Sequence, residues 1–92
     1  MIDTFVIVRC RDAGVHCGIL RAVAGRCVEL ADARRLWFWR GANTLHEVAI
    51  SGCAKNSRIS EPVASILLLE ACEVIPCTAK AEKNLRESRW SD

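Results

Sequence analysis

Short runs rich in β-branched residues, separated by glycine turns, fill the first thirty positions and restrict the folds open to the chain. The run TFVIVRCR is β-branched and aromatic, and it has the length of an ordinary strand. The sequences DAG and AG supply turns at Gly14 and Gly25, because glycine adopts positive φ without steric cost. The runs VHCGILRAV and RCVELA therefore predict a hairpin from Val15 to Leu30, with Gly18 a candidate bulge.

A helical pattern replaces the strand pattern after residue 43. Thr44, followed three residues later by Glu47, matches a capping box, and Gly52 stands where the helix would end. The apolar positions in between fall on one helical face: Leu45, Val48 and Ala49. The segment predicts a short helix inserted after the strands.

The remaining third combines a polar stretch, an apolar stretch and a second helical pattern. CAKNSRISEP is loop-like, whereas VASILLLEACEVIP predicts two strand segments that meet near residues 70–72 and end at Pro76. Thr78 is the expected N-cap of a C-terminal helix over about residues 78–90. This helix has a thin apolar stripe: Ala81, Leu85 and Trp90. We therefore expect it to fray or to lie across a neighbouring subunit.

The whole chain, residues 1–92, is expected to form one domain of the α+β class. We predict a small twisted antiparallel sheet or partly open β-barrel, with one short inserted helix and a C-terminal helix. A composition of 51% hydrophobic and 26% charged residues is ordinary for a globular protein. A domain of this size is marginal alone, which favours a homo-oligomer.

Six cysteines raise the question of disulfides or zinc. They form no CxxC pair, and a structural zinc site usually has a short-spaced pair at each end. The N-terminal run MIDTFVIVRCRD is interrupted by charge too early for a signal peptide or a membrane span. We expect reduced core cysteines, no metal, no cofactor, no membrane association and a cytoplasmic location.

Residue pairs typical of catalysis are missing from the sequence. His16 and Cys17 are adjacent, and neighbours on a strand point to opposite faces. The carboxylates are scattered, and neither a glycine-rich phosphate loop nor an HExxH motif is present. The expectation is a protein without enzymatic activity.

The stretch RRLWFWR, residues 34–40, concentrates arginine and aromatic side chains. Strict alternation would place Arg35, Trp37 and Trp39 on one face, with Leu36 and Phe38 facing the core. Arginine binds phosphate through paired hydrogen bonds, and a tryptophan face can stack a base. The alternative is a tryptophan core covered by arginine side chains, since this pairing is common in small domains.

Other cations could adjoin this stretch. Arg9 and Arg11 would project to one face of the first strand, and the candidate ligand-binding residues are Arg9, Arg11, Arg34, Arg35, Trp37, Trp39, Arg40 and His46. Residues 1–60 contain nine Arg and Lys against five Asp and Glu, a net +4, whereas residues 61–92 contain four against six, a net −2. The imbalance favours an anionic partner, although the overall charge of +2 is low for a nucleic-acid-binding protein.

Three segments carry a resemblance to a known family: VIVRCRDAGVHCGIL, DARRLWFWRGANTLHEVAISG and EPVASILLLEACEVIPCT. Together, over about residues 5 to 80, they resemble an uncharacterised family of small proteins from tailed phages and prophages. The resemblance implies an accessory phage protein that acts in the host bacterial cytoplasm. It implies no activity and no functional residue.

Two functions fit these features. The first is the binding and sequestration of an anionic nucleotide-type ligand, such as a host immune signal, at arginine–aromatic pockets. The alternative is a protein–protein interaction module that inhibits or adapts a host or phage protein, since tryptophan and arginine are also enriched at interface hot spots.

Overall fold

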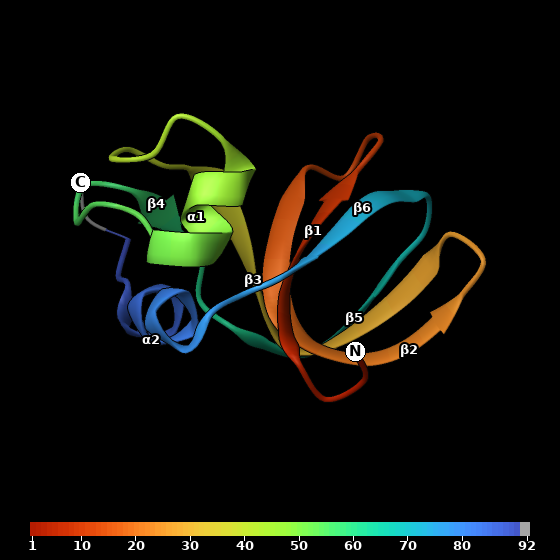
Figure 1. Cartoon of the computed structure of the whole chain (residues 1–92). Helices are drawn as coiled ribbons and strands as arrows, with labels where there is room; N and C mark the ends of the chain where they lie inside the picture. The colour runs from red at the N-terminus through yellow and green to blue at the C-terminus, as the bar shows by residue number, and fades with distance from the viewer. Residues whose placement is uncertain (91–92) are drawn as a thin grey trace.

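Six strands and two helices make up the fold in the computed structural model, which describes residues 1–90 (Figure 1). In chain order the elements are β1 (Phe5–Cys10), β2 (Val15–Ala24), β3 (Cys27–Phe38), α1 (Leu45–Ser51), β4 (Arg58–Ile59), β5 (Val63–Leu68), β6 (Ala71–Pro76) and α2 (Ala79–Glu87).

All the strands belong to one antiparallel sheet that curls without closing. Its order is β4-β3-β2-β1-β6, and β5 also pairs with β3. A turn at residues 69–70 joins β5 to β6, yet within residues 1–90 β5 pairs only with β3 and β6 only with β1. The α+β class and the partly open barrel predicted from the sequence are confirmed.

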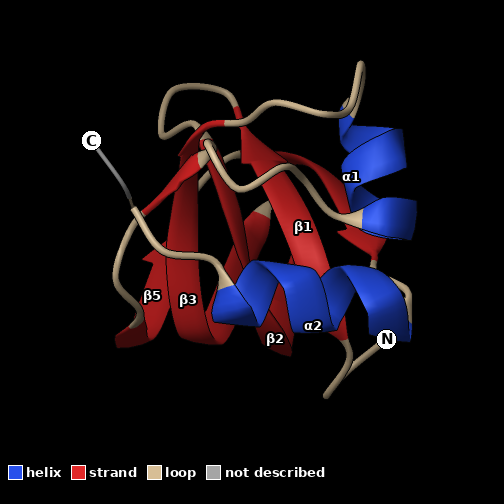
Figure 2. Ribbon diagram, turned by 90° about the vertical axis from the view of Figure 1, so that its left-hand side faces the viewer, coloured by secondary structure: helices blue, strands red, loops and turns tan. Residues whose placement is uncertain are grey.

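The curled sheet is buried on both faces, and each face has its own apolar core. The barrel-side core, inside the curl, consists of Val6, Val8, Cys10, Leu20, Val28, Leu30, Ala33 and Leu68. The helix-side core lies between the sheet and the two helices and consists of Phe5, Ile7, Cys17, Leu36, Val48, Ala49, Cys53, Ile59 and Leu85. Figure 2 shows α2 lying across the strands on this second side.

A bend in the β2–β3 hairpin connects the two cores. The register of β2 against β3 shifts between Cys17 and Ile19, which confirms the predicted bulge at Gly18. A Cβ at position 18 would lie 2.8 Å from the carbonyl oxygen of Ala31, so a side chain has no space there. Across the bend Asp32 adopts φ 50°, and the apolar positions of β3 pass from the barrel-side core to the helix-side core.

Both helices begin at the predicted caps. The Thr44 hydroxyl accepts a hydrogen bond from the backbone N–H of Glu47 at 3.3 Å, and the Thr78 hydroxyl accepts one from Ala81 at 3.1 Å. The reciprocal bond of the capping box goes one residue earlier than expected, since the Glu47 carboxylate accepts from the N–H of Asn43. Gly52 ends α1 with φ 81°.

Two sequence expectations about the second half of the chain are wrong. The stretch taken as loop, residues 53–62, contains β4, because pairing with β3 fully buries Ile59. The C-terminal helix neither frays nor crosses to a neighbour: Ala81 and Leu85 are fully buried against their own chain. The few apolar side chains of α2 are enough to hold the helix in place because hydrogen bonds to the rest of the chain supplement them. No helix within residues 1–90 has the length and apolar character needed to cross a membrane.

Candidate functional site

The arginine–aromatic stretch begins inside β3 and leaves the sheet at its end. Leu36 faces the helix-side core as predicted, but Phe38 does not: it is 37% exposed, with the Arg40 guanidinium 5.2 Å from its ring centroid. The pairing of β3 with β4 shifts register between Leu36 and Phe38, which interrupts the two-residue alternation. The prediction that Phe38 faces the core is therefore wrong.

A groove forms beside this strand end. It measures about 290 Å³ and is bounded on one side by the β1–β2 turn, residues 12–15, and on the other by Arg35, Leu36, Trp37 and Trp39. Trp37 is 60% exposed, whereas Trp39 is half-buried and packs against the helix-side core. The structure thus brings together Arg35, Trp37 and Trp39, the three residues that alternation placed on one face. We call this the Trp37 groove.

An aromatic cluster stands next to the Trp37 groove. The rings of Trp37 and Trp90 are 5.4 Å apart between centroids and tilted by 36°. The Arg58 guanidinium lies 5.5 Å from the first ring and 5.7 Å from the second, within the range of a cation–π contact. Trp90 is 44% exposed, so this cluster presents apolar rings and a cation to solvent. From the sequence Trp90 is expected only to pack, and no pattern singles out Arg58.

Arg34, the neighbour of Arg35, has a different environment. It is only 5% exposed, and its guanidinium donates four hydrogen bonds to backbone carbonyls. The acceptors are Ser60 at 2.7 Å, Leu85 at 2.8 Å, Arg86 at 2.9 Å and Ser88 at 2.6 Å. Because the last carbonyls of a helix lack partners and carry partial negative charge, a buried cation suits them. Arg34 therefore anchors the end of α2 and is not free for a ligand.

The other candidate cations lie apart from the Trp37 groove. Arg9 pairs with Glu73 at 2.9 Å between Nε and Oε1, and with His46 on α1 it borders a separate depression of about 270 Å³. Arg11 is exposed beyond the end of β1, where its backbone N–H donates to the Glu70 carbonyl. The expected convergence of Arg9 and Arg11 on the tryptophans is thus not found for Arg9, because β1 directs it toward β6.

Burial shifts the pKa values of His16, Cys17 and Cys77 in the direction that favours their neutral forms. The Nε2–H of His16 donates to the Ala13 carbonyl at 2.9 Å, and burial lowers the pKa of this imidazole, with Arg35 adding to the effect. Burial raises the pKa of the Cys17 and Cys77 thiols to about 12. Cys17 belongs to the helix-side core, while His16 pairs across the sheet with Arg35. The two residues therefore form no nucleophile–base pair.

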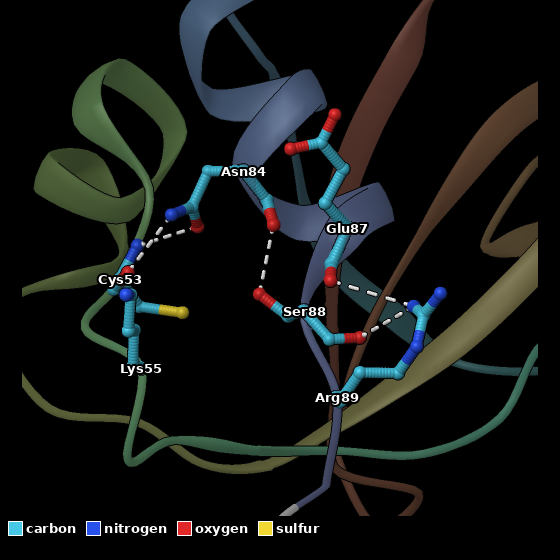
Figure 3. A pocket seen from close by; sticks show the side chains of 6 residues that line it. All are labelled: Cys53, Lys55, Asn84, Glu87, Ser88 and Arg89. Carbon is cyan, nitrogen blue, oxygen red and sulfur yellow. Dashed lines mark hydrogen bonds between the residues drawn. The ribbon is translucent and has the colours of Figure 1, made fainter.

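A cavity of about 460 Å³, larger than the Trp37 groove, was not indicated by any sequence pattern (Figure 3). It lies between the segment after α1 and the end of α2, and its lining residues are Cys53, Lys55, Asn84, Glu87, Ser88 and Arg89. Asn84 is occupied there, since its amide exchanges two 2.9 Å hydrogen bonds with the backbone of Cys53. The cavity has no aromatic side chain, so the Trp37 groove is the better candidate site.

None of the six cysteines forms a disulfide in the structure. Within the described part of the chain, no group of three or more His, Cys, Asp or Glu side chains is arranged to hold a metal ion.

The fold is thus that of a small α+β domain with an open antiparallel barrel, and its most distinctive surface is an arginine–tryptophan groove at one strand end. The sequence profile described as Domain of unknown function (DUF6948) matches residues 3–85, and the chain belongs to this family. No curated protein and no solved structure matches the chain.

Proposed function

We propose that this protein is a non-enzymatic binding protein that sequesters an anionic nucleotide-type ligand in the Trp37 groove. The observation that carries the proposal is the presence of Arg35, Trp37 and Trp39 along one groove, with the Trp37 indole open to solvent. A residue that served only the core would be covered, whereas Trp37 is 60% exposed.

The groove offers each part of a nucleotide a suitable partner. The exposed face of Trp37 can stack a base, a contact worth about 1–3 kcal/mol. The Arg35 guanidinium can pair with a phosphate, and the Asp12 carboxylate, also at the groove, can accept hydrogen bonds from exocyclic amino groups or ribose hydroxyls. Because Asp12 would repel a polyanion, the groove favours a small ligand over a nucleic-acid strand.

The biological setting in this proposal is that of an accessory protein of a tailed phage, acting in the host bacterial cytoplasm. The resemblance of three sequence segments to phage and prophage proteins supports this setting. A host immune signal of nucleotide type is a ligand that a phage would benefit from removing, and removal requires binding without catalysis.

Thermal denaturation with a panel of nucleotides tests the proposal. The panel comprises cyclic dinucleotides, cyclic mononucleotides, and nucleoside mono- and diphosphates. A ligand at 100 times its dissociation constant should add about 2.7 kcal/mol to the free energy of unfolding and raise the melting temperature. Quenching of tryptophan fluorescence should accompany the shift.

Variants of two groove residues locate the site, and a variant of an arginine outside the groove is their control. Arg35→Met and Trp37→Ala should lose the thermal shift while keeping the unliganded melting temperature. Arg40→Met is the control, since Arg40 stacks on Phe38 and does not line the Trp37 groove. Equal binding by Arg35→Met and the unmodified chain, or no shift with any nucleotide, would contradict the proposal.

The Trp37–Trp90–Arg58 cluster favours the second candidate, a protein–protein interaction module. Two exposed indoles bridged by an arginine have the composition of an interface hot spot. The two functions differ in their dependence on Trp90, which does not line the groove. Trp90→Ala should leave nucleotide binding intact but weaken a protein complex about tenfold or more.

A further inference from the structure

The most apolar strand of the protein is also one of its most exposed. In β5 only Leu68 is buried, Ile66 is half-buried, and the other four residues are exposed. Val63 is 51% and Leu67 61% exposed on the outer face of the sheet, and Leu69 follows at 62%. Isolated exposed apolar residues are common on proteins, but three within seven positions form a patch.

The backbone of β5 is open along the same strand. Within residues 1–90 it pairs with β3 on one side only, and Figure 2 shows it at the margin of the sheet. Alternate N–H and C=O groups of β5 therefore point away from β3 without a strand partner. Proteins usually protect such an edge with lysine, a bulge or an internal proline, and residues 63–69 contain none of these.

We propose that β5 is a dimerisation strand, and that the occupant of its open edge is the β5 of a second copy of this chain, antiparallel to the first. The two-fold axis would pass beside Ser65, so that Ser65 faces the partner's Ser65 and Val63 faces the partner's Leu67. Pairing across a two-fold axis brings the same surface of both copies together and closes at a dimer.

Two antiparallel copies of β5 are complementary to each other in this register. Residues 62–69 carry no charge, so no like charges meet along the paired strands. The flanking carboxylates are offset, because Glu61 would face the partner's Leu69 and Glu70 would face the partner's Ser60. On the outer face, Val63 would cover the partner's Leu67 in two equivalent apolar pairs, which stabilise antiparallel strands. A partner of a different sequence would not repeat this complementarity twice.

Cysteine cross-linking tests both the dimer and its register. In a Cys72→Ser background, which removes the exposed native thiol, Ser65→Cys would place two thiols at directly opposed positions across the axis. Oxidation with copper–phenanthroline in air should then convert most of the protein to a covalent dimer on a non-reducing gel. Leu69→Cys is the control, because position 69 is also exposed but would face the partner's Glu61. Similar cross-linking of both variants would overturn the register.

Opposite charges introduced at the facing positions 63 and 67 provide a second, independent test, with the mass in solution as the measurement. Light scattering of the unmodified chain at about 100 µM should give twice the 10.2 kDa mass of one copy. Leu67→Lys and Val63→Glu should each give the monomer mass, and the double variant should regain the dimer, since each lysine would face a glutamate. A monomeric unmodified chain, or a dimer unaffected by either single substitution, would overturn the proposal. These outcomes do not depend on nucleotide binding.

Discussion

The two halves of β3 are buried by different means. Its first half contributes Val28 and Leu30 to the apolar barrel-side core, and more and less buried side chains alternate along it. Its second half contributes Leu36 to the helix-side core, together with a buried arginine whose acceptors lie up to 54 residues further along the chain. The barrel half is specified by local alternation and the helix half by long-range polar contacts.

The contrast has a consequence for where the candidate site can form. In the barrel half both edges of β3 are paired, with β2 along one edge and β5 along the other. In the helix half the pairing with β2 stops at His16 and Arg35, and β3 continues to Phe38. The edge of this continuation that β2 leaves unpaired borders the Trp37 groove, so the site depends on the half of β3 that is not paired along both edges.

The largest effect is expected from breaking the polar anchor of the helix half. Arg34→Met should lower the free energy of unfolding by about 3–5 kcal/mol, because it leaves buried carbonyls without donors. Hydrogen exchange should show that α2 loses protection before the barrel strands do. Arg35→Met is the control and should stay within about 0.5 kcal/mol of the unmodified chain. Equal protection of α2 in both variants would show that Arg34 does not anchor the helix.

A smaller effect is expected at the bend that joins the halves. Gly18→Ala should cost about 1–3 kcal/mol, since the added methyl group would meet the Ala31 carbonyl and the β2–β3 ladder must shift. Urea denaturation measures this cost. Gly14→Ala serves for comparison: its Cβ meets nothing within 4 Å, and only its φ of 83° is unfavourable. A Gly18→Ala variant as stable as the parent would mean that the bend has room for a side chain.

Much of the barrel half and the start of α1 could be predicted from sequence, because their signals are local. The Val15–Leu30 hairpin, the Gly18 bulge and the cap at Thr44 each depend on residues close in the chain, and all are confirmed. The orientation of Phe38 could not be predicted, since it depends on pairing with β4, a two-residue strand inside a polar stretch. Likewise, alternation places Arg34 on the same face of β3 as Leu36, but nothing nearby in the sequence shows that its guanidinium would bond the carbonyls at the end of α2.

The same limit applies to the candidate site. Arg35, Trp37 and Trp39, which alternation placed on one face, do line one groove, but Leu36 lines it as well and Trp39 packs against the helix-side core. Alternation could not show that Trp90 would reach Trp37 from 53 positions away, or that Arg9 would turn toward Glu73.

The smallest expected effect concerns pH and His16. Because the pKa of this buried imidazole is lowered below 6.5, the unfolded chain takes up a proton first as pH falls. The stability that neutral His16 contributes is therefore complete above pH 6.5 and is lost as pH falls toward the lower folded value. His16→Gln should flatten the stability profile below pH 6.5, as followed by chemical denaturation at a series of pH values. A His16→Gln variant that loses stability below pH 6.5 as steeply as the unmodified chain does would show that His16 is not the titrating group.

The span of the Arg34 contacts also sets the order of events during synthesis. A ribosome makes Arg34 more than fifty residues before Leu85, Arg86 and Ser88, and it makes β1 more than sixty residues before the strand β6 that pairs with it. The β2–β3 hairpin can form while translation continues. The Arg34 guanidinium stays hydrated until its acceptor carbonyls have left the exit tunnel. Contacts of such large sequence separation slow folding. The nascent chain therefore exposes an incomplete sheet until β6 and α2 emerge. Protection by chaperones matters most during this interval, because exposed strand edges and apolar surface favour aggregation.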